Sequence, residues 1–276
     1  MEAEALLRDS SAAPRVAAVA TPTPPAVLTR EILAPAAVVV LAAIMTILDA
    51  TIVNVALPTL GRDLHTSITT IQWVATVYLL AFAAVIPLSG WLSERVGAKT
   101  LWLGSLALFV TGSLLAGLSW SIGALIVFRV VQGLGGGMIM PLGQTILAGA
   151  AGPQRMGRVM SIVGVPMLLA PIMGPVIGGA LVEAASWRWI FFVNLPVGGV
   201  ALLLALRLLP SVPRRPPHRF DALGAVLLPA GLVAVLYGLA PRAPARRAGR
   251  STARRRSACL AGRRAYCSSR KASARR

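Results

Sequence analysis

Long apolar segments recur along the chain, separated by short segments rich in Gly, Pro or charged residues. The apolar segments lie at about 33–58, 71–92, 101–119, 121–149, 159–182, 189–209 and 222–240. Roughly 20 apolar residues in a helix are enough to cross the hydrocarbon core of a bilayer. The pattern therefore predicts an all-α integral membrane protein with seven transmembrane helices.

The composition excludes a soluble protein. Hydrophobic residues make up 56% of the 276 residues, charged residues only 13%, and the mean hydropathy is +0.75. Soluble domains carry roughly 45–50% apolar and about 25% charged residues. No nucleophile with a base and an acid, no phosphate loop and no metal-ligand spacing is recognisable in the sequence. The sequence therefore predicts neither an enzyme nor a bound metal or cofactor.

Basic residues indicate how the spans are oriented. If the amino terminus lies in the cytoplasm, the inner segments carry eleven of them: Arg8, Arg15, Arg30, Arg95, Lys99, Arg155, Arg158, Arg207, Arg214, Arg215 and Arg219. The outer loops carry only Arg62 and Arg188. Because basic residues accumulate on the cytoplasmic side, we expect a multi-pass protein of the cell's inner (plasma) membrane with a cytoplasmic amino terminus.

Most of the net charge of +18 comes from the end of the chain. Residues 241–276 hold twelve Arg and one Lys without any acid, whereas residues 1–240 hold fourteen bases and nine acids. Such a tail buries too little apolar surface to fold, and we expect disorder. Three interpretations of this tail are open. It is a lipid- or nucleic-acid-binding arm, a genuine disordered tail, or an out-of-frame segment. Its Arg-rich composition, its abrupt start and its outer position after a seventh span favour the last, so we predict no nucleic-acid partner.

These patterns predict five segments along the chain. A cytosolic leader, a six-helix bundle, a cytosolic linker, a seventh transmembrane helix and the basic tail cover residues 1–30, 31–209, 210–221, 222–240 and 241–276, respectively. Pro14 and Arg15 interrupt the leader, which therefore does not have the pattern of a signal peptide.

Two charged residues lie deep within predicted spans, Asp49 in the first and Arg129 in the fourth. A charged group there costs on the order of 3 kcal/mol unless it faces a cavity or a partner. Burial favours the neutral form of a carboxyl group, which suits a group that takes up and releases protons. The alternative is a structural carboxylate held by hydrogen bonds between helices. We hypothesise that Asp49 and Arg129 pair, directly or through water.

Uncharged polar residues and glycines accompany these two charges. Gln132 lies three residues after Arg129, so both side chains can point the same way. Asn54 and Gln132 are candidates for the wall of a cavity. The glycine cluster at 133–137 predicts close helix packing, since Met138 and the lack of a preceding strand exclude a dinucleotide site.

The turn between the second and third spans is strongly charged. It covers residues 90–99 and contains Glu94, Arg95 and Lys99. Glu94, near a helix end, can accept hydrogen bonds from Arg95 or from exposed amides of the next helix. The alternative is that the turn is a charged anchor at the membrane surface.

The fifth span combines prolines with glycines. Pro166, Pro171 and Pro175 predict kinks, because each removes a backbone hydrogen bond from the helix. Gly174 and Gly178 form a small-xxx-small packing face. These features are compatible with a helix that rocks against its neighbours and equally with static packing.

Taken in order, these segments resemble the major facilitator superfamily, in particular its fourteen-helix drug:proton antiporters. The resemblance covers about residues 33–240 and rests on motifs in the family's order, at 48–58, 72–78, 90–100, 129–137, 164–179, 187–196 and 220–224. In the third motif, Glu94 stands where Asp is usual and Ala98 where a base is common.

The resemblance implies roles for individual residues. Asp49 and Arg129 would take part in proton coupling. The cytoplasmic gate motif would comprise Gly90, Glu94, Arg95, Gly97 and Lys99, and the antiporter motif, which limits leak, would comprise Gly164, Gly174, Pro175, Gly178 and Gly179. Small, drug-like molecules would be exported by alternating access, driven by the proton gradient without a bound cofactor.

A transporter of this kind needs two six-helix halves around a midplane site, whereas this sequence contains one half and a linking helix. We therefore expect a truncated form of a multidrug-type antiporter. The alternatives are a half-transporter that works as a dimer and a non-transporting membrane subunit. In each case the lipid bilayer is a partner, and the resemblance implies a small-molecule substrate without identifying it.

Overall fold

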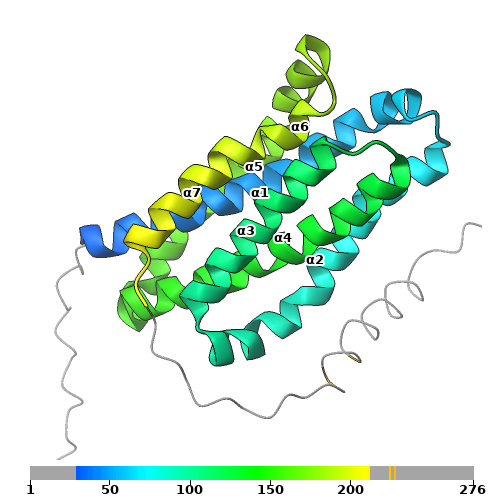
Figure 1. Ribbon diagram of the computed structural model, residues 1–276. Helices are drawn as coiled ribbons and strands as arrows, with labels where there is room; N and C mark the ends of the chain where they lie inside the picture. Colours follow the sequence, from blue (N-terminus) through cyan, green and yellow to red (C-terminus); the bar gives the residue numbers. More distant parts are fainter. Residues whose placement is uncertain (1–28, 212–223, 225–226, 228–276) are drawn as a thin grey trace, which may run out of the picture. The chain divides into compact units, whose positions relative to one another are not determined.

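The computed structural model describes residues 29–211, together with Gly224 and Leu227. Its helices are α1 (Arg30–Asp63), α2 (Ile68–Val96), α3 (Ala98–Gly117), α4 (Ile122–Ala151), α5 (Pro153–Ala184), α6 (Trp189–Phe192) and α7 (Asn194–Leu208). They form a bundle of long helices (Figure 1), and no strand occurs among the described residues.

Six spans of the described chain are long and apolar enough to cross a membrane, with α6 and α7 together forming the last one. They confirm the first six predicted spans and the all-helical fold. The predicted leader, linker, seventh span and basic tail fall almost entirely outside the described residues.

Short connections join the helices on the predicted inner side. Gly97 alone separates α2 from α3, and Gly152 alone separates α4 from α5. Their φ angles are 97° and 72°. A residue with a Cβ rarely adopts such angles, so glycine permits both turns. On the predicted outer side, Ser67 and Ser121 cap α2 and α4 by accepting hydrogen bonds from the backbone N–H groups of Thr70 and Ala124.

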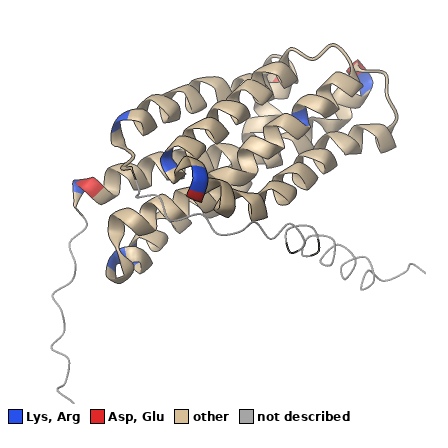
Figure 2. Cartoon of the chain, turned by 60° about the horizontal axis from the view of Figure 1, so that its bottom comes forward, with Lys and Arg blue, Asp and Glu red and all other residues tan. Residues whose placement is uncertain are grey.

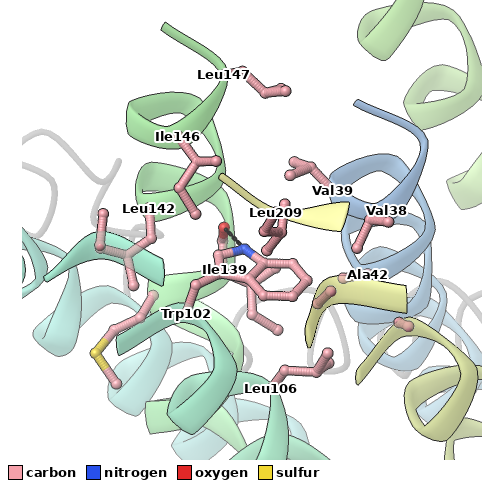
Figure 3. Packing of buried hydrophobic residues seen from close by; sticks show 14 of the residues in the cluster. Val38, Val39, Ala42, Trp102, Leu106, Ile139, Leu142, Ile146, Leu147 and Leu209 are labelled. Carbon is pink, nitrogen blue, oxygen red and sulfur yellow. Dashed lines mark hydrogen bonds between the residues drawn. The ribbon is translucent and has the colours of Figure 1, made fainter. Parts of the chain in front are cut away.

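The core is formed where α4 packs between α2 and α3 and where α1 packs against α5 and α7. Figure 3 shows Trp102 of α3 among aliphatic side chains of α1 and α4. Trp102 is fully buried, and its Nε1 donates a hydrogen bond to the Ile139 carbonyl oxygen at 3.0 Å. The indole therefore fills the core and satisfies its polar atom there.

Glycines let the helices approach closely. A Cβ added to Gly135 of α4 would lie 2.9 Å from Cα of Phe109 in α3, and one added to Gly133 would lie 2.6 Å from the Tyr78 carbonyl oxygen in α2. The predicted close packing of the glycine cluster is therefore confirmed.

The prolines of α5 do not interrupt the helix. It continues through all three of its internal prolines, at which the sequence predicts kinks, without ending.

Candidate functional site

Charged side chains are sparse on the described helices (Figure 2), and two of them meet inside the bundle. Nη1 of Arg129 lies 2.6 Å from Oδ2 of Asp49, and the two side chains are 1% and 0% exposed. The structure thus brings together the two residues that the sequence suggests as a pair. A buried ion pair is stable only if further hydrogen bonds satisfy its remaining lone pairs and protons.

The Asp49 carboxylate has two more donors. Nε2 of Gln132 and Nδ2 of Asn194 each donate to Oδ1 of Asp49 at 2.9 Å. With the bond from Arg129, the carboxylate accepts three hydrogen bonds to a charged group, which are stronger than bonds between neutral groups. Asp49 belongs to α1, Gln132 to α4 and Asn194 to α7, so one carboxylate connects three helices.

Arg129 also has partners other than Asp49. Its Nη1 donates to Oε1 of Gln132 at 2.8 Å, and its Nε donates to the Val74 carbonyl oxygen at 3.3 Å. The guanidinium lies 4.0 Å from the centre of the Tyr78 ring and 5.8 Å from that of Phe191. Aromatic faces attract a desolvated cation. These contacts hold Arg129 in place independently of the Asp49 charge.

Ser113 of α3 extends the network to a helix backbone. Its Oγ accepts a hydrogen bond from Nδ2 of Asn194 at 3.0 Å and donates one to the Phe191 carbonyl oxygen at 2.9 Å. We call Asp49, Ser113, Arg129, Gln132 and Asn194 the buried polar cluster. Asp49 contributes the only carboxyl group among these five side chains.

The residues of the cytoplasmic gate motif lie elsewhere. Tyr78, whose ring contacts Arg129 of the buried polar cluster, is in the first half of α2. Glu94 and Arg95 of the gate motif are at the end of the same helix, about 24 Å further along its axis. The Arg95 guanidinium stacks 4.2 Å from the Trp91 ring, and Nζ of Lys99 donates to the Leu206 carbonyl oxygen at 3.3 Å. Lys99 thereby ties the start of α3 to the end of α7. Gly97 provides the turn, and Gly90 has no neighbour within 4 Å of its would-be Cβ.

The antiporter motif packs next to Asp49 through two of its glycines. A Cβ on Gly174 would collide with the Thr51 hydroxyl, and one on Gly178 would lie 3.2 Å from Cγ2 of Ile52. These contacts confirm the predicted packing face. The other motif residues do not share this contact: Gly164 and Gly179 have open space where a Cβ would point, and Pro175 is exposed.

The two cavity candidates have different surroundings. Asn54 lines a cavity of about 560 Å³ where α1 ends and α2 begins, together with Leu57, Pro58, Gly61, Arg62, Thr66, Ile68, Ile71 and Gln72. Nδ2 of Asn54 donates to the Ala50 carbonyl oxygen of its own helix at 3.0 Å. Gln132 does not line this cavity, because its side chain is fully buried in the polar cluster.

Sequence reasoning did not identify Asn194, Ser113 or Tyr78 as site residues. Asn194 carried a usable signal, since an amide within an apolar span needs a hydrogen-bond partner. Ser113 carried none, because serine is common in membrane helices and often bonds to its own backbone.

Residues 39–262 match the family described as the Major Facilitator Superfamily. The Multidrug resistance protein B homolog of Mycobacterium tuberculosis (strain ATCC 25618 / H37Rv) is 47% identical over 211 residues, covering 76% of this chain and 39% of the relative. The Multidrug export protein EmrB of Haemophilus influenzae is 40% identical over 193 residues, covering 70% of this chain and 38% of the relative. The chain thus spans about two fifths of the length of these relatives.

Among solved structures, the chain is similar in fold to the proton:xylose symporter XylE of the major facilitator superfamily. The TM-score is 0.59 at 14% sequence identity, and the alignment covers 66% of this chain and 45% of that one. At this identity the likeness concerns the fold alone.

Proposed function

The chain belongs to the major facilitator superfamily, and we propose that it forms the amino-terminal half of a proton-coupled exporter of small, drug-like molecules. Members of the superfamily are multi-pass membrane transporters, not enzymes. We propose that an ion gradient drives this protein without a bound cofactor. The drug-like substrate class is supported by the names of the multidrug relatives. The observation that carries proton coupling is the buried pair of Asp49 and Arg129.

The buried pair suits a proton switch. With Asp49 charged, its carboxylate holds α1, α4 and α7 together through three hydrogen bonds. A proton on Asp49 removes its attraction to Arg129, which inside a protein is worth several kcal/mol. A difference of this size is enough to shift the population between two arrangements of the helices. Each proton that enters down a potential of 100 mV supplies about 2.3 kcal/mol for this change.

The two motifs outside the cluster fit roles in alternating access. Gly174 and Gly178 seat α5 against the turn of α1 that follows Asp49, so a shift of α1 would be passed to α5. Lys99 connects the inner ends of α3 and α7, where a gate would open or close. We propose that the inner turn closes the cytoplasmic side and that the antiporter motif limits leak between the two halves.

Transport requires a second set of six helices, supplied by a longer polypeptide or by another copy of this chain. The face of α5 that points away from the bundle suits contact with such a partner or with lipid, because it carries exposed apolar side chains. Leu168 is 75% exposed, Ile172 67% and Val176 65%. The protein would reside in the inner (plasma) membrane with its amino terminus in the cytoplasm and with no nucleic-acid partner. A non-transporting membrane subunit is the remaining alternative, for which neutralising Asp49 would change nothing.

A chimera tests whether these helices support proton-coupled export. Residues 29–211 replace the matching segment of the Mycobacterium tuberculosis relative, and ethidium accumulation is followed in inverted membrane vesicles with an imposed pH gradient. Asp63→Asn is the matched control, because Asp63 is an exposed acid at the end of the same helix. We expect accumulation with the chimera and with Asp63→Asn, and its loss with Asp49→Asn.

Two results would overturn the proposal. One is a chimera that is present in the membrane but inactive, as expected for a segment from a non-transporting subunit. The other is Asp49→Asn that accumulates ethidium at the control rate. The dimeric form is tested separately by the mass of the intact 276-residue chain in lipid nanodiscs, where two copies are expected for a half-transporter and one copy excludes it.

A further inference from the structure

We propose that Asn194 and Ser113 form a hydrogen-bond relay that reverses when Asp49 takes up a proton, so that Asp49 is paired in both charge states. The inference rests on the proposed function, because it assumes that Asp49 binds a proton. Its basis is a chain of three contacts. Nδ2 of Asn194 donates both to Oδ1 of Asp49 and to Oγ of Ser113, and Oγ of Ser113 donates to the Phe191 carbonyl oxygen.

A proton on Asp49 creates a donor that needs an acceptor. The carboxylate only accepts hydrogen bonds, whereas the protonated group must donate one, and a buried donor without a partner is strongly unfavourable. All three partners of Asp49 present N–H groups to it. At least one partner must therefore change if the proton is to remain inside the bundle.

Two of the three partners are poorly suited to this change. Arg129 has five N–H groups and no acceptor. Gln132 has an amide oxygen, but this oxygen accepts a hydrogen bond from Nη1 of Arg129 at 2.8 Å. Turning that amide over would point its NH₂ group at the guanidinium. Asn194 is left as the partner that can become an acceptor for Asp49.

Turning the Asn194 amide by half a turn exchanges its oxygen and nitrogen. The oxygen then faces Asp49 and accepts the new O–H bond. It also faces Ser113, whose hydroxyl is both a donor and an acceptor. The hydroxyl hydrogen rotates from the Phe191 carbonyl to the Asn194 oxygen. No covalent bond changes, and the added proton stays on Asp49. The hydrogen bond from Ser113 to Phe191 is given up, and the Asn194 NH₂ group, which had donated to Asp49 and Ser113, needs new acceptors on the side where its oxygen had been.

The lost bond connects Ser113 of α3 to Phe191 of α6. Phe191 is in the four-residue helix α6, directly before the break that leads into α7. Protonation of Asp49 would therefore release the Phe191 carbonyl from α3. Among the described residues, two charged or titratable side chains face Asp49, namely Arg129 of α4 and Tyr78 of α2. The contact from α7 is the uncharged amide of Asn194, and α3, α5 and α6 contribute no charged or titratable side chain to the contacts of Asp49. Protonation of Asp49 is therefore the event that reverses the relay.

The composition of the chain makes the relay measurable. Asn54 and Asn194 are its only asparagines. In an Asn54→Leu chain, asparagine labelled with ¹³C at the side-chain carbonyl reports on Asn194 alone. Infrared difference spectra between alkaline and acidic pH in lipid nanodiscs then follow this carbonyl and the carboxyl group of Asp49 together. Asn54→Gln replaces Asn54→Leu if the latter does not fold.

The relay predicts that the Asn194 carbonyl stretch moves to lower frequency as Asp49 becomes protonated, with the same midpoint pH, because this carbonyl gains hydrogen bonds. The shift should be smaller in Ser113→Ala and absent in Asp49→Gln, which removes the carboxyl group without adding a labelled asparagine. An Asn194 band that stays in place or rises while Asp49 titrates would overturn the relay and leave the proton site intact. No Asp49 carboxyl signal at any pH at which the protein remains folded would overturn both.

Discussion

Gly112 of α3 lies directly against the backbone of Gln132 in α4, so that a Cβ on Gly112 would come within 2.8 Å of the Gln132 Cα. This contact sets the distance between the two helices at the residue that bonds Asp49. The polar cluster therefore depends on a glycine that carries no polar group itself.

Gly112→Ala should destabilise the bundle by about 1–3 kcal/mol, because the added methyl group must push α3 and α4 apart. Gly104→Ala, in the same helix, is the control, since its Cβ would meet nothing within 4 Å. The control should be neutral or more stable, because alanine favours helices over glycine by about 0.5–1 kcal/mol. The free energy of unfolding in mixed detergent micelles distinguishes them, and equal losses would show that the contact is not tight.

The Asp49–Arg129 pair predicts strong coupling between its two members. Asp49→Asn leaves the Arg129 charge buried without its counter-charge, which should cost about 3–5 kcal/mol. The double variant Asp49→Asn with Arg129→Gln should cost clearly less than the sum of the single variants. The same unfolding assay measures all four chains of this cycle. Additive losses would mean that the two charges do not stabilise each other.

Tyr78 should support Arg129 through its ring rather than its hydroxyl. The ring lies 4.0 Å from the guanidinium, whereas the hydroxyl makes a long hydrogen bond of 3.4 Å to the Thr46 carbonyl oxygen. Tyr78→Phe should therefore cost less stability than Tyr78→Leu, which also loses a cation–π contact of up to about 2 kcal/mol. The reverse order in the unfolding assay would assign the main role to the hydroxyl.

The predicted orientation can be tested with single cysteines. Both native cysteines, Cys259 and Cys267, are replaced by serine, and either His65→Cys or Gln154→Cys is introduced at an exposed position. With the amino terminus inside, a membrane-impermeant thiol reagent added to whole cells should label His65→Cys and not Gln154→Cys. The opposite pattern would reverse the topology.

The spans were predictable from the sequence because each needs only a local run of apolar residues. The pairing of Asp49 with Arg129 was accessible for a different reason, since each charge in hydrocarbon requires a partner and few candidates exist. Asn194 was harder to place, because it lies 145 residues after Asp49 and next to an aromatic segment that suggested an interfacial role. Its contact with Asp49 depends on how α1 and α7 pack.

The surroundings of the glycines also needed the structure. Gly164 and Gly174 both lie in the fifth predicted span, and the sequence does not distinguish their surroundings. In the structure, Gly164 borders open space, whereas Gly174 packs against Thr51 of α1. Sequence periodicity assigns a residue to one face of a helix, but it does not show which neighbouring helix that face meets.

Infrared spectra of the wild-type chain in lipid nanodiscs measure directly whether Asp49 takes up a proton reversibly. We expect acidification to produce the carbonyl stretch of a buried carboxyl group, and we expect this band to disappear on return to alkaline pH. The band should be missing in Asp49→Asn and present in Asp63→Asn. A wild-type spectrum without this band, or the same band in Asp49→Asn, would show that Asp49 is not the proton-binding group.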